Sequence, residues 1–316
     1  MKAVDTPGPL ALDRKARARA RVVPLQGIRS PRKKEGLIGL IAVAPAFLIV
    51  ICFMAFPIFF TLYISLHKTN GLTYEWRGFE NYFLIFKDPI VLQVFTNNLK
   101  FLISVPLVIS AALVLSVLLF EKVRGWKIFR VIFFLPSVLS VAVIGIMFRN
   151  AFGYYGSVNQ ALGLLEVEPI QFFTSSAWAT SIIILALVWS GFGYQSLILL
   201  AGLTSIDPAV YEAAAMDGAG WWRRLWSVTL PNIKKVLGFV SIINILYVFS
   251  SLFGFIFVMT AGGPGFDTTT IDYLVYLRAF SSSNLGAGAA LATVLFIIIG
   301  ILTLIQSKIF LQREDN

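Results

Sequence analysis

Long apolar stretches that are almost free of charge constrain this chain more than any other feature of its sequence. The first of them, residues 36–66, contains no Asp, Glu, Lys or Arg. It exceeds the roughly 20 residues that an α-helix needs to cross a bilayer. Hydrophobic residues make up 58% of the sequence and charged residues only 13%, whereas the helices of a soluble protein carry a charged face opposite their apolar stripe. The sequence therefore predicts a membrane protein.

Further apolar stretches predict five more membrane-spanning helices, the second of which contains Pro136. They cover residues 99–120, 131–148, 177–203, 236–260 and 285–306. The predicted fold is an all-α integral membrane domain of six transmembrane helices, residues 36–306. Residues 1–35 are basic and rich in proline, so we expect a disordered tail there. Residues 307–316 form a short polar tail.

The distribution of Lys and Arg predicts the orientation of these helices. With six spans, both tails lie on the same side of the membrane as segments 121–130 and 204–235. That side holds 20 of the 26 Lys and Arg residues. Because cytoplasmic segments carry the excess of positive charge, both termini are predicted to be cytoplasmic. The basic tail adjoins the first span, which indicates contact with anionic membrane lipid and not with nucleic acid.

Residues 206–233 form a charged segment between two apolar stretches. Asp207 can cap a first helix, and Gly218 supplies the left-handed residue that commonly ends one. A second short helix is predicted from Trp221 to about Thr229, ended by Pro231. The segment is therefore a predicted helix–Gly–helix element. By amphipathicity alone, a connecting loop that lies on the membrane surface is an equally good interpretation.

This segment resembles the EAA signature of ABC importer permeases, which reads Glu-Ala-Ala, three residues, Gly, nine residues, Ile, one residue, Leu-Pro. At these spacings the chain carries Glu212, Ala213, Ala214, Gly218, Leu230 and Pro231. Val228 stands where isoleucine is usual. Asp217 precedes the signature glycine, and in this feature the chain resembles the carbohydrate-importing branch of the family.

The resemblance implies a cytoplasmic coupling loop, residues 204–235, in a type I importer of a bacterial inner or plasma membrane. In that family the loop docks on ATPase subunits, here through Glu212, Ala213, Ala214, Asp217, Gly218, Leu230 and Pro231. It also implies a second homologous permease subunit, two ATP-binding cassette ATPase subunits, and an extracellular or periplasmic solute-binding protein that delivers a sugar. The orientation predicted from Lys and Arg agrees with a cytoplasmic loop.

Polar residues within the fourth and fifth predicted spans are candidates for a solute path. Asn244 needs hydrogen-bond partners in hydrocarbon, and Gly191 with Gly193 interrupts an aliphatic helix. Both features also occur where membrane helices pack closely, so this alternative stays open. Resemblance to the maltose permease implies sugar contacts at Leu187, Gly191, Tyr194, Asn244, Val248 and Ser251. Gly191 and Tyr194 agree with that relative in residue type, whereas Asn244, Val248 and Ser251 do not. The resemblance therefore does not identify the substrate.

Several kinds of chemistry lack their residues in this sequence. No phosphate-binding Gly-x-x-x-x-Gly-Lys-Ser/Thr loop, His-Glu-x-x-His run, paired cysteines or Gly-x-Ser-x-Gly turn is present, so we expect no cofactor, no metal and no catalytic role. The sequence thus predicts a non-catalytic permease subunit of an ATP-driven sugar importer. One alternative is an importer of glycerol phosphate or another small polar solute, although the former would favour fixed positive charge along the path. An ATP-independent channel or secondary carrier would not need the coupling loop, and a membrane scaffold or sensor would not need polar groups that converge at mid-membrane.

Overall fold

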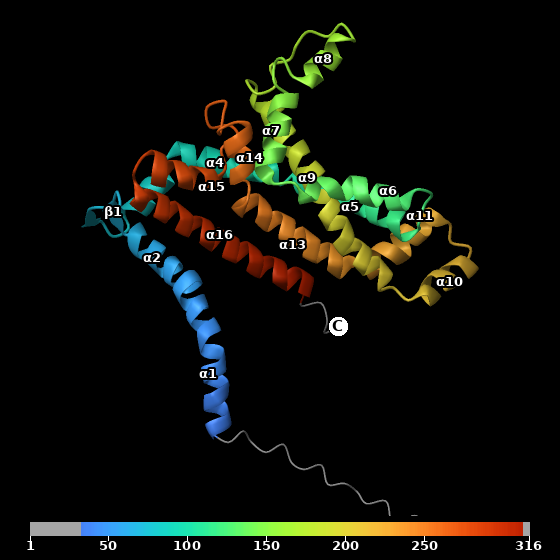
Figure 1. The fold of residues 1–316 in the computed structure, drawn as a ribbon, viewed down its shortest axis with the longest axis horizontal. Coiled ribbons are helices and arrows are strands. Elements are labelled where there is room, and N and C mark those ends of the chain that lie inside the picture. Colours follow the sequence, from blue (N-terminus) through green and yellow to red (C-terminus); the bar gives the residue numbers. More distant parts are fainter. Residues whose placement is uncertain (1–32, 312–316) are drawn as a thin grey trace, which may run out of the picture. The chain divides into compact units, whose positions relative to one another are not determined.

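The computed structural model describes residues 33–311 and the side chains of residues 41–308, and most of these residues are helical (Figure 1). The chain forms two units, Met1–Pro57 and Ile58–Asn316. The predicted tails, residues 1–35 and 307–316, extend beyond the described residues. Helix α1 begins at Lys33, and α16 ends at Leu311.

The described part of the first unit is one continuous apolar helical stretch. It consists of α1 (Lys33–Val50) and a π-helical turn (Ile51–Ala55), after which α2 (Phe56–Ser65) continues into the second unit. From Ile41 to Ser65 this stretch is long and apolar enough to cross a membrane, and its most apolar part is exposed throughout. Such exposure suits a helix that faces lipid or another membrane subunit.

Four helices among the described residues are long and apolar enough to span a membrane. They are Ile41–Ser65, Pro89–Phe120, Ser176–Thr204 and Leu285–Lys308. Two bent pairs also pass the same test: Trp126–Val138 with Val141–Ala151, bent by 99°, and Trp221–Asn232 with Lys234–Ser250, bent by 70°. The described residues therefore hold up to six spans, if each bent pair is one span. The predicted all-α membrane class is confirmed, whereas the count of six stays a prediction.

After α2, the second unit continues with a small hairpin and the second predicted span. Strand β1 (His67–Thr69) pairs antiparallel with β2 (Tyr74–Trp76), and α3 (Glu80–Lys87) follows. Helices α4 (Pro89–Phe101) and α5 (Ser104–Phe120) then form the span, which starts earlier than the predicted residue 99. The reason is local, because the Asp88 carboxylate accepts from the Ile90 N–H at 2.9 Å and Pro89 suits the first helical position.

The third predicted span, residues 131–148, is not straight. It consists of α6 (Trp126–Phe134), a 3-10 turn (Leu135–Val138) and α7 (Val141–Ala151), after which α8 (Ser157–Gly163) follows. Pro136 lies in the turn, and the Ser140 hydroxyl caps α7 at the Val143 N–H. A Cβ at Gly193 of α9 (Ser176–Thr204) would lie 2.2 Å from the Phe133 carbonyl oxygen, so this glycine lets α9 pass the end of α6.

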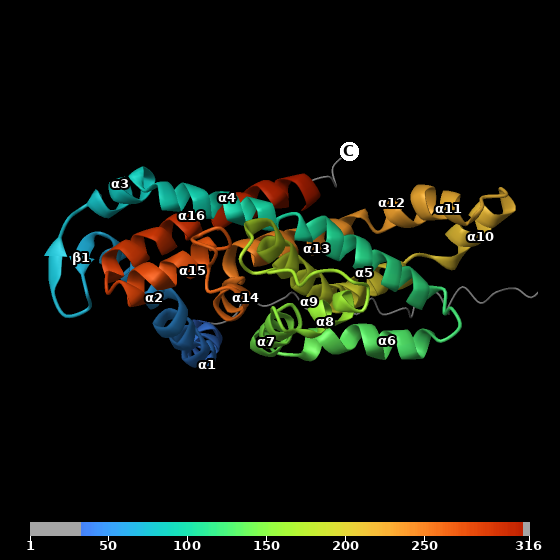
Figure 2. The ribbon, with the colours of Figure 1, turned by 90° about the horizontal axis from the view of Figure 1, so that it is seen from above.

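Helix α9 (Ser176–Thr204) lies beside α5, and the coupling loop follows it (Figures 1 and 2). The loop contains α10 (Pro208–Met216), α11 (Trp221–Arg224), a π-helical turn (Leu225–Thr229) and α12 (Leu230–Asn232). The predicted end of its second helix near Thr229 is therefore wrong, and the helical backbone continues to Asn232. Pro231 occupies the first turn of α12, where a missing N–H is tolerated.

The fifth predicted span, residues 236–260, is divided in two. Helix α13 (Lys234–Ser250) ends before α14 (Phe253–Met259) begins. The Asp272 carboxylate fixes this break, because it accepts from the Phe253 N–H at 2.7 Å, the Thr270 hydroxyl at 2.5 Å and the Tyr273 N–H at 2.9 Å. Burial raises the pKa of Asp272 above its usual value, and these hydrogen bonds oppose the rise.

The chain closes with α15 (Ile271–Tyr276), a π-helical turn (Leu277–Ser281) and α16 (Leu285–Leu311). The buried side-chain amide of Asn98 joins α4, α13 and α15 by hydrogen bonds. Asn98 of α4 donates to the Val248 carbonyl at 2.9 Å and accepts from the Ile271 N–H at 2.9 Å. The main apolar core surrounds this region and includes Phe101, Ile183 and Phe255. Within this unit the β-hairpin and α10 lie at opposite ends (Figure 2).

Candidate functional site

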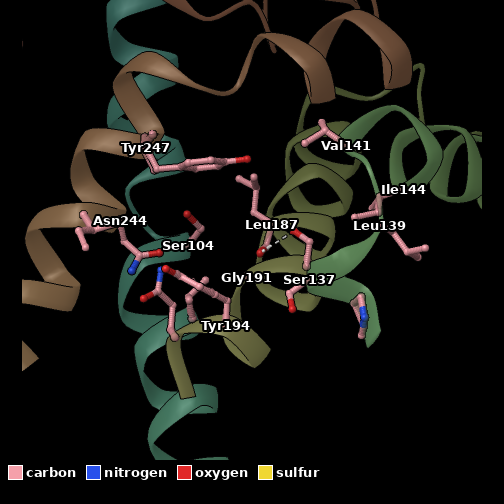
Figure 3. A pocket seen from close by; sticks show the side chains of 16 residues that line it. Ser104, Ser137, Leu139, Val141, Ile144, Leu187, Gly191, Tyr194, Asn244 and Tyr247 are labelled. Atoms are coloured by element: carbon pink, nitrogen blue, oxygen red, sulfur yellow. Dashed lines mark hydrogen bonds between the residues drawn. The ribbon is translucent and has the colours of Figure 1, made fainter. Parts of the chain in front are cut away.

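A cavity of about 290 Å³ lies among α5, the α6–α7 break, α9 and α13 (Figure 3). The residues that line it are Ser104, Val108, Pro136, Ser137, Leu139, Val141, Ile144, Leu187, Ser190, Gly191, Tyr194, Gln195, Ile243, Asn244, Tyr247 and Val248. None of these residues is an acid, a lysine, an arginine or a histidine. Such a mixture of apolar walls with a few polar groups is typical of small-molecule sites.

The structure brings most of the predicted path residues to this cavity. Leu187, Gly191, Tyr194, Asn244 and Val248 all line it, and they come from helices far apart in the sequence. In Figure 3 the Tyr247 ring extends from α13 toward Leu187 of α9. Whether these residues contact a solute stays a prediction.

Ser251 does not line this cavity. It follows the last residue of α13 with a φ of −140°, so the helix that carries Asn244 and Val248 does not continue to it. Its hydroxyl instead lies 3.3 Å from that of Ser250, which is also exposed. The prediction treated α13 and α14 as one helix, and the break at Ser251 removes that premise.

The two glycines of α9 have different surroundings. A Cβ at Gly193 would collide with backbone at 2.2 Å, which identifies this glycine as a site of close helix packing. A Cβ at Gly191 would meet only the Val108 side chain, at an ordinary 3.6 Å or more. Gly191 therefore leaves room at the cavity wall without being required by the packing. Close packing thus applies to Gly193, whereas a solute contact at Gly191 stays a prediction.

Sequence reasoning missed the cavity walls contributed by α5 and by the bent third span. Ser104 on α5 donates its hydroxyl to the Phe101 carbonyl at 2.7 Å, and Ser137 donates to the Phe134 carbonyl at 2.7 Å. It also passed over Gln195, although this residue adjoins Tyr194 in the polar interruption of an aliphatic helix. A buried amide in a membrane helix was the signal that could have identified it.

The coupling loop has the caps that its sequence predicts. The Asp207 carboxylate accepts from the Ala209 N–H at 2.9 Å and begins α10. Gly218 has a φ of 72°, in the left-handed region. Its N–H donates to the Ala215 carbonyl at 3.0 Å, and the next N–H, of Ala219, donates to the Ala214 carbonyl at 3.0 Å. This pair of bonds is a Schellman motif, so the turn at Gly218 is sharply defined.

Aromatic side chains hold the coupling loop against the end of α5. The Tyr211 ring lies 5.8 Å from the Phe120 ring, and its hydroxyl lies 3.3 Å from that of Thr229. The Trp221 indole N–H donates to the Glu121 carboxylate at 2.5 Å. A second cavity, of about 600 Å³, lies between these elements. Side-chain contacts therefore attach the loop to the end of α5.

The predicted docking residues fall into two groups by exposure. Glu212, Ala213, Asp217, Gly218 and Pro231 are exposed, while Ala214 is half-buried. Leu230 is also half-buried, but it packs with the buried core residues at the base of α9. Glu212 has no ion-pair partner among the residues that the structure describes. The first group forms a surface, whereas Leu230 anchors the loop. Docking itself stays a prediction.

The described residues contain no cluster of three or more His, Cys, Asp or Glu side chains that could hold a metal ion.

Comparison with known sequences gives a consistent family. The model described as "Binding-protein-dependent transport system inner membrane component" matches residues 44–315. The chain is 32% identical over 284 residues to the lactose transport system permease protein of Rhizobium radiobacter, covering 87% of this chain and 95% of the relative. It is 33% identical over 285 residues to the sulfoquinovosyl glycerol transport system permease protein of Agrobacterium fabrum, covering 89% and 92%.

The fold is also similar to a chain in the crystal structure of a bacterial ABC transporter involved in the import of the acidic polysaccharide alginate. The TM-score is 0.77 at 20% identity, and the match covers 90% of this chain and 98% of that one. This likeness concerns the fold alone. The family model and the relatives together show that the chain is a multi-pass membrane protein that belongs to the family of binding-protein-dependent transport system inner membrane components.

Proposed function

We propose that this chain is one of two homologous permease subunits of an ATP-driven importer, with six spans and both termini in the cytoplasm. It forms half of a path for a neutral sugar or oligosaccharide, which an external solute-binding protein delivers. Two ATPase subunits dock below the permease pair, and the coupling loop is the docking surface of this chain. The observation that carries this proposal is that one unit holds both an uncharged polar cavity and an exposed, sharply capped α10.

The choice of a neutral substrate is supported by the cavity. A phosphate group taken out of water needs fixed positive charge or several strong donors to offset its desolvation. The lining residues offer no cation. Hydroxyl and amide groups beside apolar walls suit sugar hydroxyls better. The printed name of the lactose relative supports a neutral sugar. The name of the sulfoquinovosyl glycerol relative supports a sugar but not its neutrality, because a sulfonate is ionised.

The choice of an ATP-driven importer is supported by the coupling loop. Ala213 is small and exposed, so another surface can approach the α10 backbone closely there. Glu212 offers an exposed carboxylate that can pair with a basic residue of an ATPase. An ATP-independent channel or carrier, which is the alternative class, has no need for such a surface.

The test is reconstitution of the complete complex in proteoliposomes, with the ATPase, partner permease and binding protein encoded beside this chain. Uptake of radiolabelled glucose, lactose, maltose, raffinose and sn-glycerol 3-phosphate is measured with and without enclosed ATP. We expect ATP-dependent uptake of at least one neutral sugar. Uptake that ignores ATP would indicate a channel or carrier. ATP-dependent uptake of glycerol 3-phosphate alone would replace the neutral substrate by an anionic one.

A further inference from the structure

Gln195 is the cavity residue that has a buried hydrogen-bonding atom without a partner among the described residues. Only 6% of its surface is exposed, and it lines the cavity on the same face of α9 as Leu187 and Gly191, at four-residue intervals. Its Oε1 atom is buried and has no hydrogen-bond partner in the described part of the chain. Buried amide oxygens are almost always paired, because leaving one unpaired destabilises the fold.

The serine hydroxyls around the cavity have already used their donors. The hydroxyls of Ser104, Ser137 and Ser190 each donate to a backbone carbonyl three residues earlier, at 2.7, 2.7 and 3.2 Å. Their remaining capacity is lone pairs on oxygen. The Asn244 amide donates one N–H to the Val240 carbonyl at 2.8 Å and keeps its second N–H.

The cavity lining therefore offers both acceptors and donors. The phenol groups of Tyr194 and Tyr247 can either donate or accept. A sugar hydroxyl, which also donates and accepts, complements such a lining. Ionised phosphate or sulfonate oxygens would enter it without a compensating cation.

We propose that Gln195 is a specificity-determining residue, and that its amide oxygen accepts a hydrogen bond from one hydroxyl group of a neutral sugar in this cavity. The proposal rests on the proposed function. The terminal torsion of a glutamine is soft, so its rotation turns the oxygen toward an arriving hydroxyl. The sugar then pairs an oxygen that is otherwise unpaired, whereas a solute without a hydroxyl at that position leaves it so.

The chain provides a matched control. Gln306 on α16 is also buried, with 7% of its surface exposed, and its Oε1 atom is also unpaired among the described residues. It does not line the cavity. Gln306→Leu therefore removes the same kind of group without touching the proposed contact, and Gln195→Leu removes the contact while keeping side-chain volume.

The experiment is a cycle between permease variants and sugar analogues in the reconstituted complex. Uptake is measured for a transported sugar from the panel above, and for its monodeoxy and deoxyfluoro analogues at each hydroxyl position. Fluorine keeps the polarity of the position but cannot donate. The preference of the binding protein is the same with every permease variant, so it cancels when the ratios are compared. Co-purification of the ATPase confirms assembly of each variant.

For wild type and Gln306→Leu, we expect one position at which both analogues lower kcat/KM by about three- to tenfold, the range for one neutral hydrogen bond. Gln195→Leu should lower kcat/KM for the parent sugar by a similar factor and lose the discrimination at that position. Unchanged discrimination by Gln195→Leu at every position would overturn the assignment while leaving the proposed function intact. The same loss in Gln306→Leu would also overturn it. Absence of ATP-dependent sugar uptake by wild type would overturn the proposed function and this assignment with it.

Discussion

Replacement of Gly218 tests whether the shape of the coupling loop depends on its backbone. Gly218 has a φ of 72°, and a Cβ at this position would have no atom within 4 Å. Any effect of a side chain therefore arises from the left-handed conformation and not from a collision. For an L-residue this conformation costs roughly 1–2 kcal/mol. Asn tolerates it better, and a β-branched residue tolerates it worse.

The magnitude matters because α10 has little else to stabilise it. None of its nine residues is buried, so its local opening requires far less free energy than unfolding of the core. A loss of about 1–2 kcal/mol raises the open population roughly 5- to 30-fold. We expect hydrogen exchange of the amides of residues 211–217 to accelerate by such a factor in Gly218→Ala. Gly218→Asn should have a smaller effect, and Gly218→Val a larger one.

Gly220 provides the control in the same loop. A Cβ at Gly220 would also have no atom within 4 Å, but the φ of this residue is −65°, which any residue adopts. Exchange should be nearly unchanged in Gly220→Ala. Purified permease in nanodiscs serves for the exchange measurement, and co-purification of the ATPase should fall in the order of the exchange rates. Equal exchange in Gly218→Ala and Gly220→Ala, or equal effects of Asn and Val at Gly218, would refute the reasoning.

Three further predictions follow from packing, hydrogen bonding and exposure. Gly193→Ala, whose Cβ would collide with backbone, should abolish a monodisperse peak in detergent chromatography, whereas Gly191→Ala should fold and alter only uptake. Asn98→Leu leaves two buried backbone groups on α13 and α15 unpaired, and should destabilise the permease by about 1–3 kcal/mol in thermal unfolding. Glu212→Lys and Ala213→Trp should each weaken ATPase co-purification and substrate-stimulated hydrolysis, while sugar binding by the solute-binding protein is unchanged.

The sequence predicted those features that depend on neighbouring residues. The cap at Asp207 and the left-handed turn at Gly218 are local, and both occur as expected. The apolar stretches also located α9 and α16 closely, because the length and charge of a span are properties of the segment itself. The family and the helical membrane class were recognised from these features together.

Features that depend on distant residues were not predicted. The 99° bend of the third span needs Gly193 of α9 as well as Pro136, and the break after Ser250 needs the Asp272 carboxylate. Periodicity within one helix contains no information about such partners. The same limit explains the missed cavity walls on α5 and at Ser137, because no pattern in those segments indicates which helices face them.

Two helices join the cavity to the coupling loop. Helices α9 and α13 both line the cavity, and α9 ends at Thr204 just before α10, while α13 begins at Lys234 just after α12. Near the loop they approach closely, since a Cβ at Gly202 would lie 3.0 Å from Val236 Cγ2. Close-packed helices shift as units and do not deform continuously. A displacement of α10 by a docked ATPase should therefore move both helices together relative to the other walls of the cavity and change its width. A channel without an ATPase would gain nothing from this continuity, whereas an importer depends on it.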